Sequence, residues 1–306
     1  MARDDDFEDD DRPRRRRPRD DDEDDRPARS RRRRDEDDDY DRPAKKKGST
    51  GVVVGILVGV FIVCCGGGGL VGYYVVRGVK KGVEQIEEMA AVANESQQNL
   101  QNLDQIGTAA HQYHDKMGKF PNNSYETQGK QSRPLLSWRV HLLPYLGEET
   151  LYKQFKLDEP WDGPNNKKLL SQMPMVYGTF EARRKAGEGK TYYRGFSHQG
   201  AMFEKPTAPG QQPPAITMAN VQDGLANTIL VIEAGEAVEW TKPDDIDWSA
   251  GKPRPALGYS PDTWQFFTVL MADGRTRQVQ KQIPDNVLRL LITRNDGQVI
   301  PAGWVP

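Results

Sequence analysis

A long uncharged and mostly apolar run, Gly51–Val76, constrains this chain more than any other feature of its sequence. A helix needs about 20 apolar residues to cross a hydrocarbon core, and this run exceeds that length. A cleavable signal peptide lies at the extreme N-terminus, whereas residues 1–50 precede this run. The sequence therefore predicts an uncleaved, single-pass signal anchor, and membrane lipid as its first partner.

Lys and Arg flank the run unequally, and this predicts the orientation of the anchor. The segment after the run carries Arg77, Lys80 and Lys81. Within residues 32–50, directly before the run, lie seven basic residues, namely Arg32, Arg33, Arg34, Arg42, Lys45, Lys46 and Lys47. Because the side richer in Lys and Arg stays in the cytoplasm, we expect residues 1–50 inside and residues 77–306 outside the cell membrane.

The segment 1–50 alternates blocks of charge and holds 17 basic and 19 acidic side chains with almost no apolar ones. Such a composition cannot bury enough apolar surface to fold, so we expect a disordered, charge-blocked tail. One interpretation is a solvated polyampholyte, and the other is an interaction tail for an acidic partner. Nucleic acid is not expected, since the acidic blocks compete for the same arginines.

After the run, apolar or small residues recur at steps of three, four and seven, which is typical of one helical stripe. The sequence predicts a long helix from just after the membrane to about Met117, stopped by Gly118 and Pro121. The stripe consists of Val79, Val83, Ile86, Ala90, Ala93, Leu100, Leu103, Ile106 and Ala110.

The rest of the chain is typical of an α+β domain, with helices first and strands later. We expect a central strand at Thr228–Ile232 and a hairpin that turns at Asp273-Gly274, with arms Phe266–Met271 and Thr276–Val279. Further helices are predicted at 137–143, 148–155, 165–172 and from Pro284 to before Asn295, with loops at 182–190 and 204–215.

Several separate blocks of this sequence resemble domain-of-unknown-function family 1559, which is abundant in planctomycete bacteria. The first half holds Asn99-Leu100, Gln105–Asp115, Gly118–Pro121, Leu136–Val140, Leu143–Leu146, Leu157–Asp162 and Asn165–Leu170. The second half holds Asp223-Gly224, Asn227–Val231, Ala272–Gly274 and Leu291–Asn295. The resemblance covers about residues 90–300.

This resemblance implies a pseudopilin-like fold, in which one long N-terminal helix packs on an antiparallel sheet. Members of the family usually carry a pilin-like N-terminus. The chain has no Gly-Phe-Thr-Leu-Ile-Glu prepilin motif before the apolar run, so the resemblance does not extend to prepilin processing. The family brings no established activity to any residue.

Two histidines on the long helix are the weak candidates for a metal site. His111 and His114 lie three residues apart and share a helix face, and a third ligand would have to come from His141 or His198. The alternative is that both rings pack where the helix meets the sheet. We expect no metal, no cofactor and no catalytic residue, because no second ligand cluster lies nearby in the sequence.

An acidic group follows the predicted central strand. Calcium prefers several oxygen ligands, but the group does not have EF-hand spacing, so we favour a solvated loop. Its members are Glu233, Glu236, Glu239, Asp244 and Asp245. Tryptophans are the remaining hint of a binding surface, and we expect most of them to be core or loop anchors. They are Trp161, Trp240, Trp248, Trp264 and Trp304.

Glycines in the apolar run predict that the membrane helix self-associates. Gly51, Gly55 and Gly59 are spaced by four, so they lie along one helix face where two backbones can approach closely. The alternative is that glycine is simply common in membrane spans. Both cysteines, Cys64 and Cys65, lie in the same run, which leaves none for a disulfide framework in the globular part.

The sequence thus favours a membrane-anchored, extracytoplasmic, pseudopilin-like structural or interaction protein of the cell envelope, and not an enzyme. Its expected partners are lipid, a second copy through the membrane helix, and an envelope protein or glycan. A solute- or glycan-binding module is the first alternative, favoured by a pocket lined with two tryptophans. A metal-dependent hydrolase is the second, favoured if His111, His114 and an acidic residue converge in a cleft.

Overall fold

The computed structural model describes residues 69–127, 132–259 and 265–304. The predictions for the tail, for the apolar run up to residue 68, for the glycine motif within it and for Trp264 all lie outside these residues. Among the helices that are described, none is both long and apolar enough to cross a membrane.

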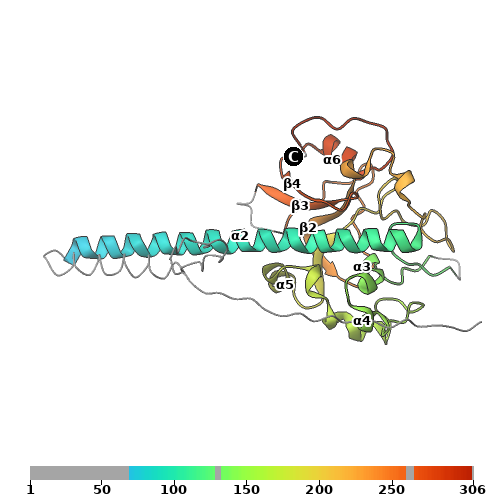
Figure 1. Cartoon of the computed structure of the whole chain (residues 1–306), viewed down its shortest axis with the longest axis horizontal. Coiled ribbons are helices and arrows are strands. Elements are labelled where there is room, and N and C mark those ends of the chain that lie inside the picture. The colour runs from blue at the N-terminus through green and yellow to red at the C-terminus, as the bar shows by residue number, and fades with distance from the viewer. Residues whose placement is uncertain (1–68, 128–131, 260–264, 305–306) are drawn as a thin grey trace, which may run out of the picture. The chain divides into compact units, whose positions relative to one another are not determined.

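A single helix, α2, runs from Gly69 to Met117 (Figure 1). Its end agrees with the prediction. Gly118 takes a left-handed conformation, with φ at 71°, and its N–H donates to the carbonyl oxygen of His114 at 2.7 Å. Glycine reaches this conformation without steric strain, which is why it closes the helix. The described part of α2 starts at Gly69, within the apolar run where a membrane helix was predicted.

Four antiparallel strands form one sheet in the order β1-β2-β3-β4. The predicted hairpin is confirmed, with Gly274 at a φ of 82° in its turn, and so is the central strand. The strands are β1 (Lys190–Arg194), β2 (Ile229–Glu239), β3 (Phe266–Met271) and β4 (Thr276–Gln280).

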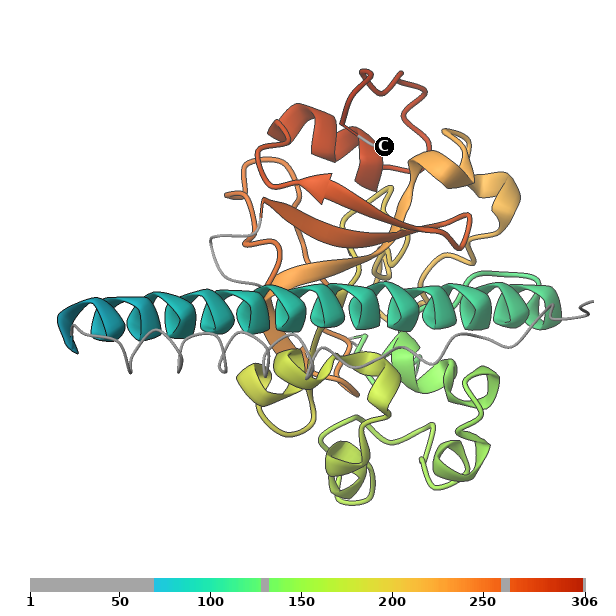
Figure 2. The ribbon, with the colours of Figure 1, turned by 60° about the vertical axis from the view of Figure 1, so that its left-hand side comes forward.

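The two faces of β3 meet different helices, because side chains alternate along a strand. Phe267, Val269 and Met271 are buried with the apolar residues of α6 (Asp285–Ile292). Thr268 and Leu270 point the other way, toward α2. The sheet therefore lies between α2 and α6 (Figure 2). Mixed helices with an antiparallel sheet confirm the α+β class.

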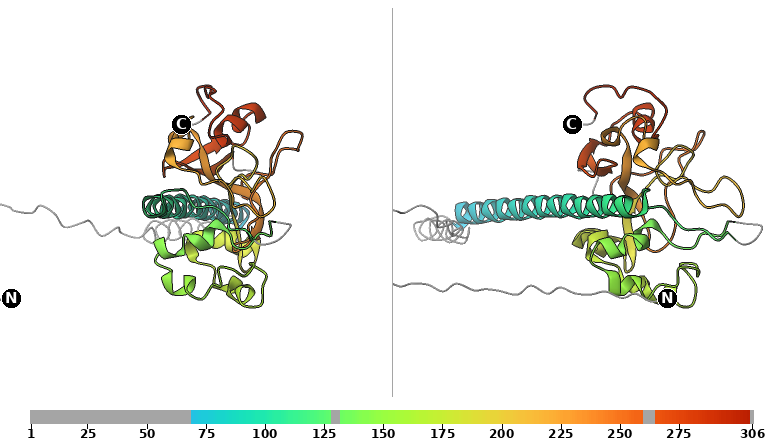
Figure 3. Two further views of the ribbon diagram at one scale, coloured as in Figure 1. Left: turned by 90° about the vertical axis from the view of Figure 1, so that its right-hand side faces the viewer. Right: turned by 45° about the vertical axis from the view of Figure 1, so that its right-hand side comes forward.

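Short helices lie on the other side of α2 from β3, β4 and α6 (Figures 1 and 3). Leu103, Ile106 and Ala110 of α2 share one core with Trp138 and residues around it. The helices are α3 (Trp138–His141), α4 (Glu149–Tyr152) and α5 (Phe180–Ala186). The described residues also form 3-10 segments at Leu143–Tyr145 (η1), Asn166–Gln172 (η2), Met175–Tyr177 (η3), Met218–Asn220 (η4) and Leu225–Asn227 (η5).

Two predicted loops are wrong. The range 182–190 holds most of α5 and the start of β1, because Thr179 caps α5 by accepting from the N–H of Ala182 at 3.2 Å. The acidic group after Ile232 begins inside β2, which continues to Glu239. The charged residues of this segment interrupt the apolar pattern that would predict a strand. Glu233 is nevertheless buried, because residues distant in sequence supply its hydrogen bonds. The range 204–215 is confirmed as free of helix and strand.

Candidate functional site

The two histidines of α2 are both engaged by the fold. His111 donates from Nε2 to the carbonyl oxygen of Ala272 at 2.9 Å and packs against the hairpin turn at Gly274. His114 accepts at Nε2 from the N–H of Met218 at 3.4 Å, and its nearest carboxylate is Asp115 at 3.8 Å. A metal would have to replace these contacts, so the geometry favours the packing interpretation.

The other two histidines do not complete a metal site with them. Burial lowers the pKa of His141 to about 4, with a further contribution from Lys119. Burial also lowers the pKa of His198, on the loop after β1. Within residues 69–127, 132–259 and 265–304, no three His, Cys, Asp or Glu side chains form a group that could hold a metal ion. The convergence that would favour a hydrolase is therefore absent from this part of the chain.

Two members of the acidic group, Glu233 in β2 and Asp245 in the loop after it, are buried, whereas Glu236 is exposed. Glu233 accepts from Asn99 Nδ2 at 2.9 Å and from the N–H of Thr268 at 3.2 Å. Asn99 also donates to Thr268 Oγ1 at 2.9 Å and accepts from the hydroxyl of Tyr193 at 2.5 Å. Burial raises the pKa of Glu233, against these hydrogen bonds. This network ties α2 to three strands.

Asp245 is the centre of a second buried network. It accepts from Asn123 Nδ2 at 2.7 Å, from the N–H of Gly195 at 2.8 Å and from Trp138 Nε1 at 3.2 Å. The guanidinium of Arg139 lies 3.7 Å away and is fully buried. Burial lowers the pKa of Arg139 to about 10, although Asp245 acts in the opposite direction. Both side chains are fully buried, and a buried guanidinium needs such a set of polar partners.

The helix and the hairpin approach each other most closely at Gly107. A side chain at this position would place its Cβ 2.8 Å from the carbonyl oxygen of Gly274 and 2.8 Å from Cδ1 of Leu270. Only glycine permits this backbone approach. Gly107, His111 and the Asn99 network together hold α2 on the sheet.

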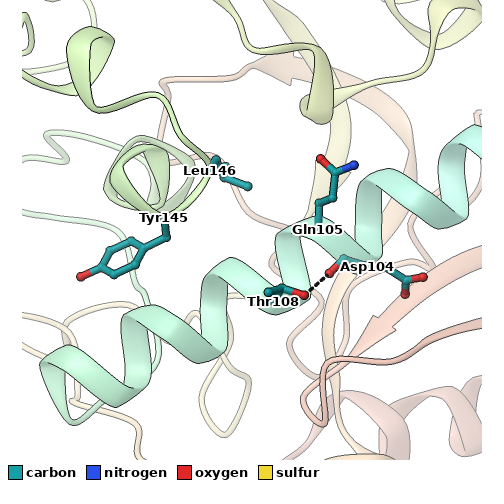
Figure 4. Close-up of a pocket in the computed structure, with 5 residues that line it drawn as sticks. All are labelled: Asp104, Gln105, Thr108, Tyr145 and Leu146. Carbon is teal, nitrogen blue, oxygen red and sulfur yellow. Dashed lines mark hydrogen bonds between the residues drawn. The ribbon is translucent and has the colours of Figure 1, made fainter. Parts of the chain in front are cut away.

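A shallow groove of about 320 Å³ lies between α2 and η1 (Figure 4). Asp104, Gln105 and Thr108 of α2 form one wall, and Tyr145 and Leu146 form the other. Small-molecule sites are mostly apolar with a few polar groups, and this lining has that character. Three of the groove's five lining residues carry polar side chains, and the other two are Tyr145 and Leu146.

The polar groups of the groove are not equivalent. Thr108 donates to the carbonyl oxygen of Asp104 at 3.0 Å, and the carboxylate of Asp104 accepts from Thr276 of β4 at 2.9 Å. Tyr145 packs edge-on against Tyr113, with ring centroids 5.5 Å apart, and Lys116 lies 5.9 Å from the centroid of Tyr145. Burial raises the pKa of Tyr113, as do the neighbouring Tyr145 and Tyr152.

None of the tryptophans in the described residues lines this groove. Trp240 and Trp248 are buried in the core, and Trp240 donates from Nε1 to the carbonyl oxygen of Leu170 at 2.9 Å. Trp161 is half-buried and carries Lys242 over its ring at 5.6 Å. The expectation that most are anchors is confirmed for Trp240 and Trp248.

Sequence reasoning missed Asn99, Tyr193 and Arg139 as the residues that organise the buried networks. Asn99 carried one indication, since a polar residue directly precedes Leu100 of the apolar stripe. Arg139 carried none, because an arginine in a short amphipathic helix normally faces solvent. Their partners lie far away in sequence, so only the fold brings them together.

The family model described as protein of unknown function (DUF1559) matches residues 97–287. The chain belongs to this family. No curated protein and no solved structure matches the chain. The DUF1559 region begins two residues before Asn99 and therefore contains the sheet, the groove and both buried networks. The earlier part of α2 precedes it.

Proposed function

We propose that this DUF1559 chain is a membrane-anchored, extracytoplasmic, pseudopilin-like structural or interaction protein of the cell envelope. One observation carries the proposal. The helix α2 begins at Gly69, inside the apolar run Gly51–Val76, and continues without a break to Met117. A run of this length supports a membrane anchor. The anchor would then pass directly into a helix that enters the core of the domain.

The arrangement of α2 supports a pseudopilin-like architecture. Its C-terminal part packs on an antiparallel sheet through Asn99, Gly107 and His111. The part before residue 97 precedes the family region, and most of it projects past the sheet (Figure 1). A long helix that displays a sheet-bearing domain is suited to presenting surfaces to partners. The groove residues and the buried networks are suited to binding and stability, not to bond cleavage.

Protease accessibility in spheroplasts tests the proposal. Full-length chain with an epitope at each end is treated with protease before and after the membrane is permeabilised. We expect loss of the C-terminal epitope and survival of the N-terminal one in intact spheroplasts, since basic residues are concentrated before the run. Protection of the C-terminal epitope, with a periplasmic control protein digested, would contradict the orientation. Extraction of the chain by high salt alone would contradict the anchor.

A solute- or glycan-binding role is the second candidate, and the groove between α2 and η1 favours it. Tyr145 and Leu146 offer an apolar wall, and the amide of Gln105 offers both donors and acceptors for hydroxyl groups. Saturation-transfer NMR of the detergent-solubilised chain with chito- and malto-oligosaccharides tests this role. Tyr145→Ala should abolish any transfer, whereas Lys153→Gln on nearby α4 should leave it unchanged. Transfer that is equal in both variants would contradict binding in this groove.

A further inference from the structure

One apolar stripe on α2 passes from a buried to an exposed environment. Leu103, Ile106 and Ala110 are fully buried, with 0% of their surface exposed. Earlier on the same stripe, Ile86 is 63% exposed and Ala90 and Ala93 are exposed as well. Residues 76–93 of α2 are called the stalk below, and they extend past the edge of the sheet (Figure 2).

The spacing of this part of the stripe is typical of a helix that packs on a second helix. Its residues follow each other at steps of four, three, four and three, a mean period of 3.5 residues. This period keeps an apolar seam facing a second helix in a left-handed coiled coil, whereas an isolated helix has 3.6 residues per turn. The seam consists of Val79, Val83, Ile86, Ala90 and Ala93, which occupy alternating d and a positions. Val79 and Val83 are half-buried, and the other three are exposed.

The charges of the stalk leave this seam free. Each charged residue lies at a b, e or f position of the heptad, outside the a and d positions that form the seam. The g positions hold Gly82 and Met89. In a parallel pair in register, Glu87 at e faces Gly82 at g of the other helix, so no like charges oppose each other. The charged residues are Arg77, Lys80, Lys81, Glu84, Glu87 and Glu88. Lys80 and Glu84 also pair along one helix at 4.0 Å.

We propose that the stalk pairs in parallel with the stalk of a second copy of this chain. The direction of pairing rests on the proposed function, since an anchor in one membrane gives all copies the same orientation. Identical helices in register place Ile86 against Ile86 and Ala93 against Ala93. The small Ala90 and Ala93 lie closest to the domains, where they allow close approach of the two backbones. The seam is short, so shared anchoring in one membrane provides the local concentration that stabilises the pair.

Site-directed disulfide cross-linking in membranes tests this pairing. The parent is the full-length chain with Cys64→Ala and Cys65→Ala, which removes both native cysteines. Val79→Cys and Ile86→Cys place a thiol on the seam. Lys81→Cys and Glu88→Cys are matched controls, each two residues away on the opposite face of the helix. We expect at least fivefold more covalent dimer from the seam variants than from their controls.

Equal dimer yields from seam and control variants, or none from either, would overturn the proposal. Antiparallel helices would also overturn the proposal. They would give no cross-link between two Val79→Cys chains, but a cross-link between a Val79→Cys chain and an Ala90→Cys chain. The protease experiment reports separately on the anchor. If protease digests the C-terminal domain but the seam variants do not cross-link, the pairing is rejected and the orientation stands. If the seam variants cross-link but the domain is protected from protease, the orientation is rejected and the pairing stands.

Discussion

Replacing Gly107 with alanine tests whether the contact between α2 and the hairpin is as close as the structure shows. A glycine-to-alanine change inside a helix normally stabilises it by about 1 kcal/mol. At Gly107 the new methyl group would lie 2.8 Å from the carbonyl oxygen of Gly274 and 2.8 Å from Cδ1 of Leu270. The leucine methyl group can rotate away. The carbonyl oxygen belongs to the turn backbone, so the helix itself must move.

The magnitude follows from two opposing effects. Overpacking of this kind destabilises a core by about 1–3 kcal/mol. A shift of α2 also weakens the 2.9 Å hydrogen bond from His111 to Ala272, which lies one helical turn further on. Such a bond contributes roughly 0.5–1.5 kcal/mol. After subtraction of the helix gain, Gly107→Ala should lower the stability by about 2 kcal/mol, or roughly 4–8 °C in Tm for a domain of this size.

Gly82→Ala is the matched control, because it lies on the same helix with nothing within 4 Å of the added methyl group. It should leave the Tm unchanged or raise it slightly. Near-UV circular dichroism of the detergent-solubilised full chain follows the buried Trp138 during heating. A Gly107→Ala variant as stable as Gly82→Ala would refute the close approach of α2 and the hairpin.

Four further outcomes follow from the buried groups. Asp245→Ala should lower the urea unfolding free energy by about 3–5 kcal/mol, since it leaves the buried guanidinium of Arg139 without its carboxylate. Burial raises the pKa of Glu233 above its ordinary 4.5, so the folded state favours the neutral carboxyl. As the pH rises from 4.5, the wild-type chain should therefore lose stability relative to the Glu233→Gln variant, which cannot ionise. The His141 ring should titrate near pH 4 by NMR, because the folded state favours its neutral form. This contribution to stability is complete above pH 6.5 and is lost as the pH falls toward 4. Mass-spectrometric metal analysis should find substoichiometric zinc; one bound metal per chain, lost in a His111→Ala/His114→Ala variant, would restore the hydrolase hypothesis.

The DUF1559 blocks and local patterns predicted most of the framework. The end of α2 at Gly118, the hairpin at Asp273-Gly274 and the last helix all follow from local chemistry: a left-handed glycine, a tight turn and a helical apolar pattern. Strand β1 was missed because Thr191, Tyr192 and Tyr193 are flanked by Gly, Lys and Arg, which together favour a loop.

The candidate sites were predicted less well than the fold. His111 and His114 were located on the correct helix, but their partners at Ala272 and Met218 are distant in sequence. The groove joins Gln105 to Tyr145 through the fold of the segment between them. Long-range contacts of this kind leave no periodic pattern in the sequence, because each partner fits the pattern of its own helix or turn.

The sequence alone determined the apolar run, the charge blocks, the long helix and the α+β class, since each depends on composition or on spacing within one segment. The tertiary structure alone decided that Glu233 and Asp245 are buried and that Gly107 touches the hairpin turn. It also decided that the stripe on α2 is exposed from Ile86 to Ala93 and buried at Leu103. The physical reason is that burial and close approach depend on which distant surfaces meet, whereas helix formation depends on neighbours along the chain.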